Sequence, residues 1–218
     1  MSITSQRLRH RFGRRWSTSE RSPTAAQAAM LSESQRLHQP TFITAVRADT
    51  AITAQFRGDY YDFRTPVDAM IQAIRLACIT DSFFAQVCYR AEVACRQRQV
   101  PAFPWILHRL SISCGQISIG PPVVMRPGVY IPHGQVVIDG LTMIEPGVVL
   151  RPFITIGLRD GMPLGPTIGE NTRIGTGAKV FGPVTLGPDV QVGANAVVTR
   201  DVPAGHTAVG IPARVLDR

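Results

Sequence analysis

Aliphatic residues recur every six positions through the second half of the chain, and this period restricts the fold more than any other feature. Neither an α-helix nor an alternating strand produces a six-residue period. A parallel β-helix does, because each flat face takes one hexapeptide and buries one aliphatic side chain at its corner. Three faces make a coil of about 18 residues, and stacked coils supply the core that a single coil lacks. The series runs through Ile119, Met125, Ile131, Ile138, Ile144, Leu150, Ile156, Ile168, Ile174, Val180, Leu186, Val192 and Val198.

The first break in the period lies beside a histidine. Seven positions, rather than six, lead from Ile131 to Ile138, so one extra residue lies close to His133. A bulge re-aims a side chain, and bulges are frequent next to functional places. The break therefore makes His133 the first candidate for a functional residue.

The second break is longer. Twelve positions lead from Ile156 to Ile168, and the stretch between them contains no convincing rung. This spacing predicts a loop that leaves the coil and carries Arg159 and Asp160.

Residues 41–115 have a helical pattern, whereas residues 1–40 are expected to form a disordered basic arm. A helix is expected to begin at Thr65, because a hydroxyl cap, a proline in the first turn and the carboxylate of Asp68 follow in order. A second helix is expected to be capped by Asp81 or Ser82, and a short third helix to open at Pro104. The first of these helices carries one apolar stripe, and the second has a predicted buried face. The stripe is Val67, Met70, Ile71, Ile74 and Cys78, and the predicted buried face is Phe84, Val87, Cys88, Ala91 and Cys95.

Positive charge is concentrated at the N-terminus. The net charge is +8, and residues 1–21 hold six arginines against Glu20. A basic arm can bind nucleic acid or anionic lipid, but no aromatic-rich basic surface follows it, so nucleic acid is not expected as a partner. A solvated extension is the alternative that the composition favours, and an organelle transit peptide is a further one.

Neither a membrane span nor a metal site is expected. No apolar run reaches membrane-spanning length. The four cysteines, Cys78, Cys88, Cys95 and Cys114, lack the paired spacing of metal ligands. They are interpreted as reduced, buried thiols of a cytoplasmic protein.

Residues 119–215 resemble the hexapeptide-repeat acyltransferases, and the helices before them narrow the resemblance to the serine acetyltransferase type. The matching stretches are "IGPPVVMRPGVYIPHG", "VVLRPFITIG", "PTIGENTRIGTGAKVFGPVTLG" and "VGANAVVTRDVPAGHTAVGIPARV". The resemblance implies a left-handed parallel β-helix over residues 116–218, which is an exception to the usual handedness of parallel crossovers. It also implies homotrimers or dimers of trimers, acetyl-CoA as co-substrate without a metal, and a place in cysteine biosynthesis. Active sites of the family lie in clefts between neighbouring coils.

The resemblance assigns roles to individual residues. His133 occupies the position of the family's catalytic histidine. Thr176 and Ala194 match small residues whose backbone borders the pantetheine arm of CoA. Gly157 and Leu158 match the turn beside the thioester.

Several charged residues are weaker candidates for binding ligands. Lys179 and Arg214 stand where they can meet the phosphates of CoA. Arg151 and Arg159 can hold a substrate carboxylate by bidentate pairing, although a solvated surface arginine is the simpler interpretation of each. Asp160 is a further candidate for substrate binding, because it lies on the predicted loop.

The sequence departs from the family's pattern where that family binds serine. Ser118 stands at the position of the aspartate that orients the catalytic histidine, and Pro132 at that of an aspartate that helps to hold serine. Leu164 and Gly165 stand where the loop normally carries an Arg-His pair, and the loop is about two residues shorter. The base and the CoA channel therefore match the family, whereas the acceptor site is rebuilt.

The chemistry of acyl transfer needs few groups. An imidazole that titrates near neutral pH can remove the proton of a hydroxyl, and such general-base help contributes about 10²–10⁴-fold. A backbone amide of the coil can stabilise the oxyanion, and no covalent protein intermediate is required. The second nitrogen of the imidazole needs an orienting group. The candidates are Ser118, Asp139, Glu145, Asp160 and a backbone carbonyl.

We therefore expect a CoA-dependent acyltransferase that moves an acetyl group to a hydroxyl of a small acceptor, serine or a related compound, with His133 as general base. Alternatives on the same fold are a sugar or amino-sugar O- or N-acetyltransferase and a catalytically silent scaffold. A zinc-dependent hydratase is disfavoured, because it needs several converging histidines and the coil region holds only His133 and His206. In a protein without catalytic activity, His133 would be a surface histidine at a coil corner. Thr176 and Ala194 would then be small only because the geometry of the coil requires small residues there.

Overall fold

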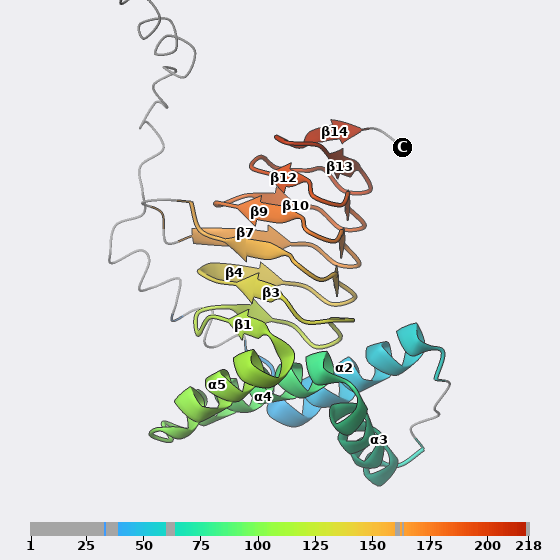
Figure 1. Ribbon diagram of the computed structural model, residues 1–218, viewed down its shortest axis with the longest axis vertical. Helices are drawn as coiled ribbons and strands as arrows, with labels where there is room; N and C mark the ends of the chain where they lie inside the picture. Colours follow the sequence, from blue (N-terminus) through green and yellow to red (C-terminus); the bar gives the residue numbers. More distant parts are fainter. Residues whose placement is uncertain (1–32, 34–38, 60–63, 160–161, 163, 217–218) are drawn as a thin grey trace, which may run out of the picture.

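The computed structural model describes residues 33, 39–59, 64–159, 162 and 164–216, and it has two parts (Figure 1). The helices gather at one end, and a stack of short strands rises from them as a prism. The helices are α2 (Phe42–Arg57), α3 (Pro66–Ile79), α4 (Asp81–Gln97) and α5 (Phe103–Gly115). The helical pattern expected over residues 41–115 is thus followed by strands from β1 (Ile117–Ile119) onward. The basic arm expected over residues 1–40 lies almost entirely outside the described residues.

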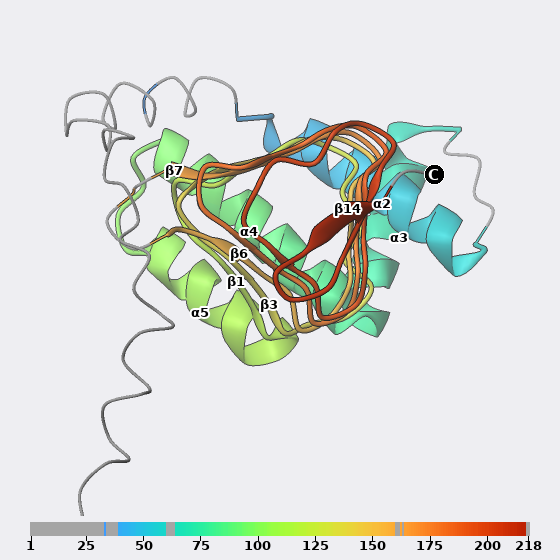
Figure 2. The same ribbon diagram turned by 90° about the horizontal axis from the view of Figure 1, so that it is seen from above.

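The strands form three sheets, which are the three faces of a triangular coil (Figure 2). Sheet A contains β1, β3 (Val136–Ile138), β6 (Thr155–Gly157), β9 (Lys179–Phe181) and β12 (Val197–Val198). Sheet B contains β2 (Val124–Met125), β4 (Leu141–Ile144), β7 (Leu164–Ile168) and β10 (Thr185–Leu186). Sheet C contains β5 (Val149–Leu150), β8 (Arg173–Ile174), β11 (Gln191–Val192), β13 (Thr207–Val209) and β14 (Arg214–Leu216). All pairings are parallel except that of β13 with β14, as a parallel β-helix requires.

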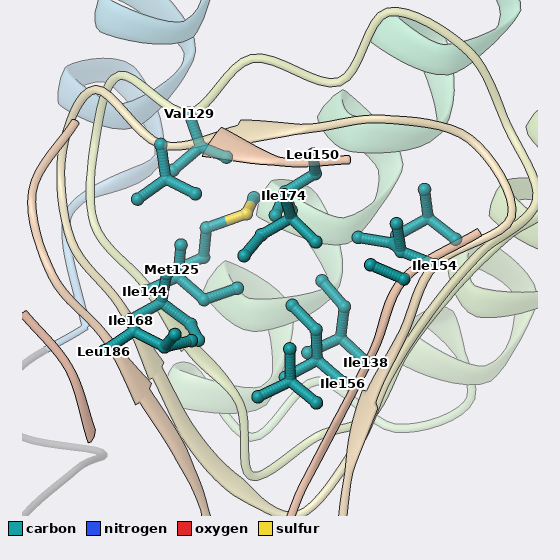
Figure 3. Packing of buried hydrophobic residues seen from close by; sticks show 14 of the residues in the cluster. Met125, Val129, Ile138, Ile144, Leu150, Ile154, Ile156, Ile168, Ile174 and Leu186 are labelled. Carbon is teal, nitrogen blue, oxygen red and sulfur yellow. The ribbon is translucent and has the colours of Figure 1, made fainter. Parts of the chain in front are cut away.

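The predicted aliphatic series forms the centre of the prism, and no member of it is more than 4% exposed. Its side chains point inward from the three faces and stack on their counterparts in the next coil (Figure 3). Stacking places each side chain one rung above an equivalent one, and the coils bury their apolar faces on each other. The six-residue period therefore predicted both the fold and its core.

Glycines that follow members of the series have a steric reason. A Cβ added to Gly175 would lie 2.6 Å from the carbonyl oxygen of Val192, in the coil above. A Cβ added to Gly169 would lie 2.6 Å from the carbonyl carbon of Gly187. The coils approach so closely at these positions that only a residue without a side chain fits.

The predicted helix faces are only partly correct. On α3, Val67, Met70, Ile71 and Ile74 are each at least 53% exposed, and the helix contacts its neighbours through Ala69 and Leu76 instead. Figure 1 shows α3 at the periphery of the helical part, so its apolar stripe has no element of the described chain to pack against.

On α4 the buried face is rotated from the predicted one, because this helix packs on both α5 and the first coil. Cys88 is buried as predicted, whereas Phe84, Val87, Ala91 and Cys95 are only half-buried. The buried residues include Phe83, Ala85, Tyr89 and Val93.

The four cysteines are free thiols, but the prediction that all are buried is wrong, since Cys78 and Cys114 are exposed. Cys88 is buried, and this burial, together with the nearby Cys114, raises its pKa to about 11. Its thiol therefore stays protonated at neutral pH.

The start of α3 offers a test of local stability. Thr65 accepts a hydrogen bond from the backbone N–H of Asp68 at 3.1 Å, and Asp68 accepts one from the N–H of Thr65 at 3.0 Å, which completes a capping box. We expect Thr65→Ala to lower the free energy of unfolding by about 0.5–2 kcal/mol, because one N–H at the helix end loses its partner. Urea denaturation followed by circular dichroism measures this change. Thr65→Ser, which keeps the hydroxyl, should behave like the unchanged chain.

Candidate functional site

His133 lies at the edge of the prism where sheet C passes into sheet A. In successive coils the chain turns this edge through Gln135, Phe153, Gly177 and Asn195, which all have positive φ, between 56° and 75°. We call the segments 132–135, 151–153, 175–177 and 193–195 the His133 edge. The edge runs up the prism from the helical end.

The extra residue predicted beside His133 is present. Tyr130 pairs with Val149, and Val137 pairs with Thr155 in the next coil. Seven positions lead from Tyr130 to Val137 but only six from Val149 to Thr155, so the lower coil bulges by one residue. With positive φ at Gln135, this bulge turns the segment that carries His133 out of the regular rung.

The helices fix the shape of the bulge. The Oγ of Ser82, in the first turn of α4, donates to the carbonyl oxygen of Pro132 at 3.2 Å. The backbone N–H groups of Gln135 and Val136 both donate to the carbonyl oxygen of Gln116, at 2.8 and 3.2 Å. A Cβ on Gly134 would lie 2.0 Å from the carbonyl oxygen of Gly115, so only glycine fits there. The backbone around His133 is therefore held from below by the ends of α4 and α5.

The side chain of His133 is exposed and forms no hydrogen bond or ion pair with the described part of the chain. Two of the proposed orienting groups are engaged elsewhere: Asp139 Oδ1 accepts from the N–H of Gly140 at 2.7 Å, and Glu145 faces Arg126 at 3.9 Å. Ser118 lies on β1, opposite Val137. Asp160 lies outside the described residues. The imidazole is thus open to solvent at the foot of the His133 edge.

Thr176 and Ala194 lie on the same edge, in the coils above His133. Each immediately precedes a left-handed corner residue, and the N–H of Asn195 donates to the carbonyl oxygen of Thr176 at 2.8 Å. Both side chains are small and exposed. Lys179 begins the adjoining strand β9, and its Nζ donates to the carbonyl oxygen of Phe153. In the coils of Thr176 and Ala194, the edge therefore carries only small side chains.

The other predicted turn residues lie on a different edge, where sheet A passes into sheet B. Gly157 ends β6 and Leu158 follows it, 39% exposed. No heavy atom outside the neighbouring residues lies within 4 Å of a Cβ added to Gly157. Arg159 lies against Gly182, and a Cβ added to Gly182 would be 3.4 Å from the Cβ of Arg159. Within one chain, the full width of sheet A separates these residues from the His133 edge.

One feature of the site, Phe153, was not singled out from the sequence. Phe153 is 55% exposed and holds a left-handed φ of 65°, an uncommon conformation for a bulky residue. Arg151 and Arg159 were both considered from the sequence for holding a carboxylate, and Arg159 was the one predicted to bind substrate. Register places Arg151 instead one coil above Pro132, close to His133. The only signal in the sequence for Phe153 was the lack of glycine or asparagine at a coil corner.

The described residues contain neither a cluster of metal ligands nor a membrane-spanning helix. In the described part of the chain, no group of three His, Cys, Asp or Glu side chains is arranged to hold a metal ion. No helix among the described residues is long and apolar enough to cross a membrane.

Known proteins resemble this chain in sequence and in fold. Residues 165–200 match the family model for the bacterial transferase hexapeptide (six repeats). A serine acetyltransferase of Synechococcus elongatus is 38% identical over 140 residues, which are 62% of this chain and 57% of that protein. One of Helicobacter pylori is 37% identical over 138 residues, 62% of this chain and 80% of that protein. The chain thus spans little more than half of the first relative and four fifths of the second.

Solved structures agree with the fold. A serine acetyltransferase in complex with cysteine superposes with a TM-score of 0.70 at 21% identity, covering 86% of this chain and 75% of that one. The soybean serine acetyltransferase apoenzyme superposes with a TM-score of 0.65 at 26% identity, covering 86% and 74%. These likenesses confirm the predicted left-handed parallel β-helix with a helical region before it. Because the chain covers four fifths of its Helicobacter pylori relative at 37% identity, it belongs to the serine acetyltransferase family of hexapeptide-repeat transferases.

Proposed function

We propose that this protein transfers an acetyl group from acetyl-CoA to the hydroxyl of a small acceptor, serine or a close relative of it, with His133 as general base. The observation that carries the proposal is the position of His133, whose imidazole has no partner among the described residues and stands on a hydrogen-bonded bulge below the small residues Thr176 and Ala194. The names of the relatives support acetyl transfer to serine. A cytoplasmic location stays a prediction.

In the proposed mechanism His133 acts twice. Its unprotonated nitrogen takes the proton of the acceptor hydroxyl as the oxygen attacks the thioester carbonyl. The carbon–sulfur bond then breaks, and the same nitrogen returns the proton to the departing CoA sulfur. The acetyl group ends on the acceptor oxygen, His133 is regenerated and no bond to the protein forms. Binding both substrates along one edge accelerates the reaction further, because the reacting atoms are already close together.

The His133 edge fits an extended pantetheine arm. Coils are stacked about 4.8 Å apart, so Thr176 and Ala194 lie roughly two and three rungs above the bulge. Their small, exposed side chains leave backbone groups accessible to a ligand that lies along the edge. Lys179, beside the same edge, is a candidate for contact with a phosphate group. CoA binding is supported by a solved serine acetyltransferase in complex with CoA, which superposes with a TM-score of 0.68 at 22% identity.

We further propose that the site is completed by a neighbouring copy of the chain in a trimer. Gly157, Leu158 and Arg159 line the edge between sheets A and B, too far from His133 to act on the same thioester within one chain. Parallel packing of two prisms would bring this edge of one copy against the His133 edge of the next. Sedimentation of the full chain measures the oligomeric state, and a monomer that is fully active would contradict the proposal. Pairing of two trimers is a further prediction that the same measurement tests.

A bulky residue placed on the His133 edge should obstruct acetyl-CoA. We expect Ala194→Phe to raise the KM for acetyl-CoA by about tenfold or more, because a large side chain removes contacts worth more than about 1.4 kcal/mol. Steady-state kinetics at saturating acceptor measure this change. Ala204→Phe is the matched control, since Ala204 is also exposed but lies on the edge between sheets B and C. An equal rise in KM for both variants would contradict the placement of CoA.

The proposed function is tested by following free thiol release from acetyl-CoA in the presence of separate acceptors: L-serine, other hydroxyl compounds and amino sugars. We expect release to depend on a small hydroxyl acceptor and mass spectrometry to find an O-acetyl product. Transfer only to an amino sugar would replace the proposed acceptor class. Failure to bind CoA and to release thiol with any acceptor would overturn the enzymatic function.

A further inference from the structure

We propose that Arg151 holds the carboxylate of the acyl acceptor beside His133, so that the protein selects acceptors in which a hydroxyl lies a few bonds from a carboxylate. This inference rests on the proposed acetyl transfer and adds to it the residue that chooses the acceptor.

Register places Arg151 directly above the bulge. Tyr130 pairs with Val149, and the N–H of Leu150 donates to the carbonyl oxygen of Tyr130 at 2.9 Å. Continuing that pairing sets Arg151 opposite Pro132, the residue before His133. Neighbouring strands lie about 4.8 Å apart, a distance shorter than an extended arginine side chain. The guanidinium of Arg151 and the imidazole of His133 can therefore reach the two ends of one small molecule.

The guanidinium of Arg151 is available for a ligand. Arg151 is exposed, and its side chain forms no hydrogen bond or ion pair with the described residues. The positive charge of Arg151 acts on the phenol of Tyr130: burial raises the pKa of Tyr130, and the cations Arg57 and Arg151 oppose that rise. Tyr130 is itself held by stacking on Phe56, with ring centroids 4.6 Å apart and planes at 6°. An arginine on a fixed surface without a carboxylate partner is suited to bind an incoming anion.

The surface above Arg151 is open. The equivalent positions in the next two coils are Gly175 and Gly193, the residues that follow Ile174 and Val192. Neither carries a side chain, so nothing at these positions covers the guanidinium from above. Arg151 is thus the residue of this column that projects a long charged side chain beside the bulge.

The remaining candidates for holding a carboxylate lie elsewhere. Arg159 packs against Gly182 on the edge between sheets A and B. Leu164 begins β7 and is not charged, and Gly165 is buried against Thr142, whose Oγ1 would be 2.1 Å from an added Cβ. Of the arginines proposed from the sequence to bind a carboxylate, Arg151 alone lies on the His133 edge. A planar guanidinium pairs with a carboxylate through two parallel hydrogen bonds, which fixes the acceptor's orientation as well as its charge.

The test compares two acceptors in the full-length protein: L-serine, and ethanolamine, which has the same amino alcohol without the carboxylate. A charge-assisted bidentate contact is worth about 10- to 100-fold in affinity. We expect the unchanged protein to favour L-serine in kcat/KM by this factor. Arg151→Gln should remove most of that preference by raising the KM for L-serine, with the ethanolamine reaction and the KM for acetyl-CoA unchanged. Arg151→Lys keeps the charge but cannot form two parallel hydrogen bonds. Its preference for L-serine should lie between those of the unchanged protein and Arg151→Gln.

Arg173→Gln is the matched control, because Arg173 is also an exposed arginine of sheet C, one coil higher and without a place on the His133 edge. It should behave like the unchanged protein. An equal loss with both acceptors, or a rise in the KM for acetyl-CoA instead, would overturn the role of Arg151, the second result indicating a phosphate contact. If the unchanged protein acetylates neither compound, calorimetric titration with L-serine still decides. Binding that Arg151→Gln abolishes supports the inference, and equal or absent binding overturns it.

Discussion

We expect His133→Ala to lower kcat for acetyl transfer by about 10²–10⁴-fold, the contribution that a positioned general base makes. The side chain is exposed and forms no hydrogen bond with the described residues, so its removal takes away no hydrogen bond within that part of the chain. The bulge itself is held by backbone contacts from Ser82, Gly115 and Gln116, which the substitution leaves in place. Activity should therefore fall while stability does not. Thiol-release kinetics and thermal unfolding of the same preparations separate the two effects.

His206→Ala is the control for this substitution. His206 is the other histidine of the coil region, and its Nδ1 lies 2.8 Å from the carbonyl oxygen of Ala204, on another edge of the prism. Its replacement should leave kcat close to that of the unchanged protein. Full activity of His133→Ala would contradict the mechanism but leave the fold and the family intact. Equal losses for the two histidine variants would indicate that neither loss reports on a base.

The prism could be predicted from the sequence because its period reports directly on its geometry. Ile144, Ile168 and Leu186 lie far apart in the chain yet stack in one column, since each stands one coil above the last. A six-residue repeat is typical of this geometry, so counting identified the buried residue of each regular rung. The same counting located the bulge at His133, because the additional residue between Ile131 and Ile138 does not fit into a regular rung.

The helical part could be predicted only as helices. A hydrophobic stripe indicates an amphipathic helix, but it does not say which element covers the stripe. On α3, Ala69 and Leu76 make the contacts while Val67 and Ile74 face outward. On α4, the first coil draws Tyr89 and Arg90 inward, and no local pattern indicates a partner that lies 34 or 35 residues further along the chain.

The candidate site could also be predicted only in part, because a sequence does not say which residues meet in space. The resemblance located His133, Thr176 and Ala194, which share one edge. It grouped Gly157 with them, although within one chain Gly157 lies on another edge. The proposed trimer would bring the two edges together, and a sequence does not distinguish contacts within a chain from contacts between copies. The choice of Arg151 over Arg159 required the register of the coils, which places one beside the bulge and the other across sheet A.

The ion pair that joins the helices to the prism was not predicted, and its loss has the largest expected effect on stability. Arg90 Nε lies 2.8 Å from Asp49 Oδ2, with the two side chains only 2% and 0% exposed. Arg90 also donates to the carbonyl oxygens of Met125 and Arg126, and Asp49 Oδ1 accepts from the N–H groups of Gly128 and Val129 at 2.8 and 3.2 Å. The pair thus satisfies backbone groups of the first coil as well as itself.

We expect Asp49→Ala to lower the free energy of unfolding by about 3–5 kcal/mol, because it leaves a buried guanidinium without its counter-charge and two N–H groups without an acceptor. Urea denaturation at a fixed protein concentration measures the change, since association also contributes to stability. Glu145→Ala is the control: Glu145 faces Arg126 at 3.9 Å with both side chains about 30% exposed, and an exposed pair is worth at most about 1 kcal/mol. The double variant Asp49→Leu with Arg90→Met removes both charges and should be more stable than Asp49→Ala alone. If the double variant is instead the less stable of the two, the cost of Asp49→Ala does not come from an unpaired buried charge, and the pair stabilises the junction mainly by packing and by its bonds to the first coil.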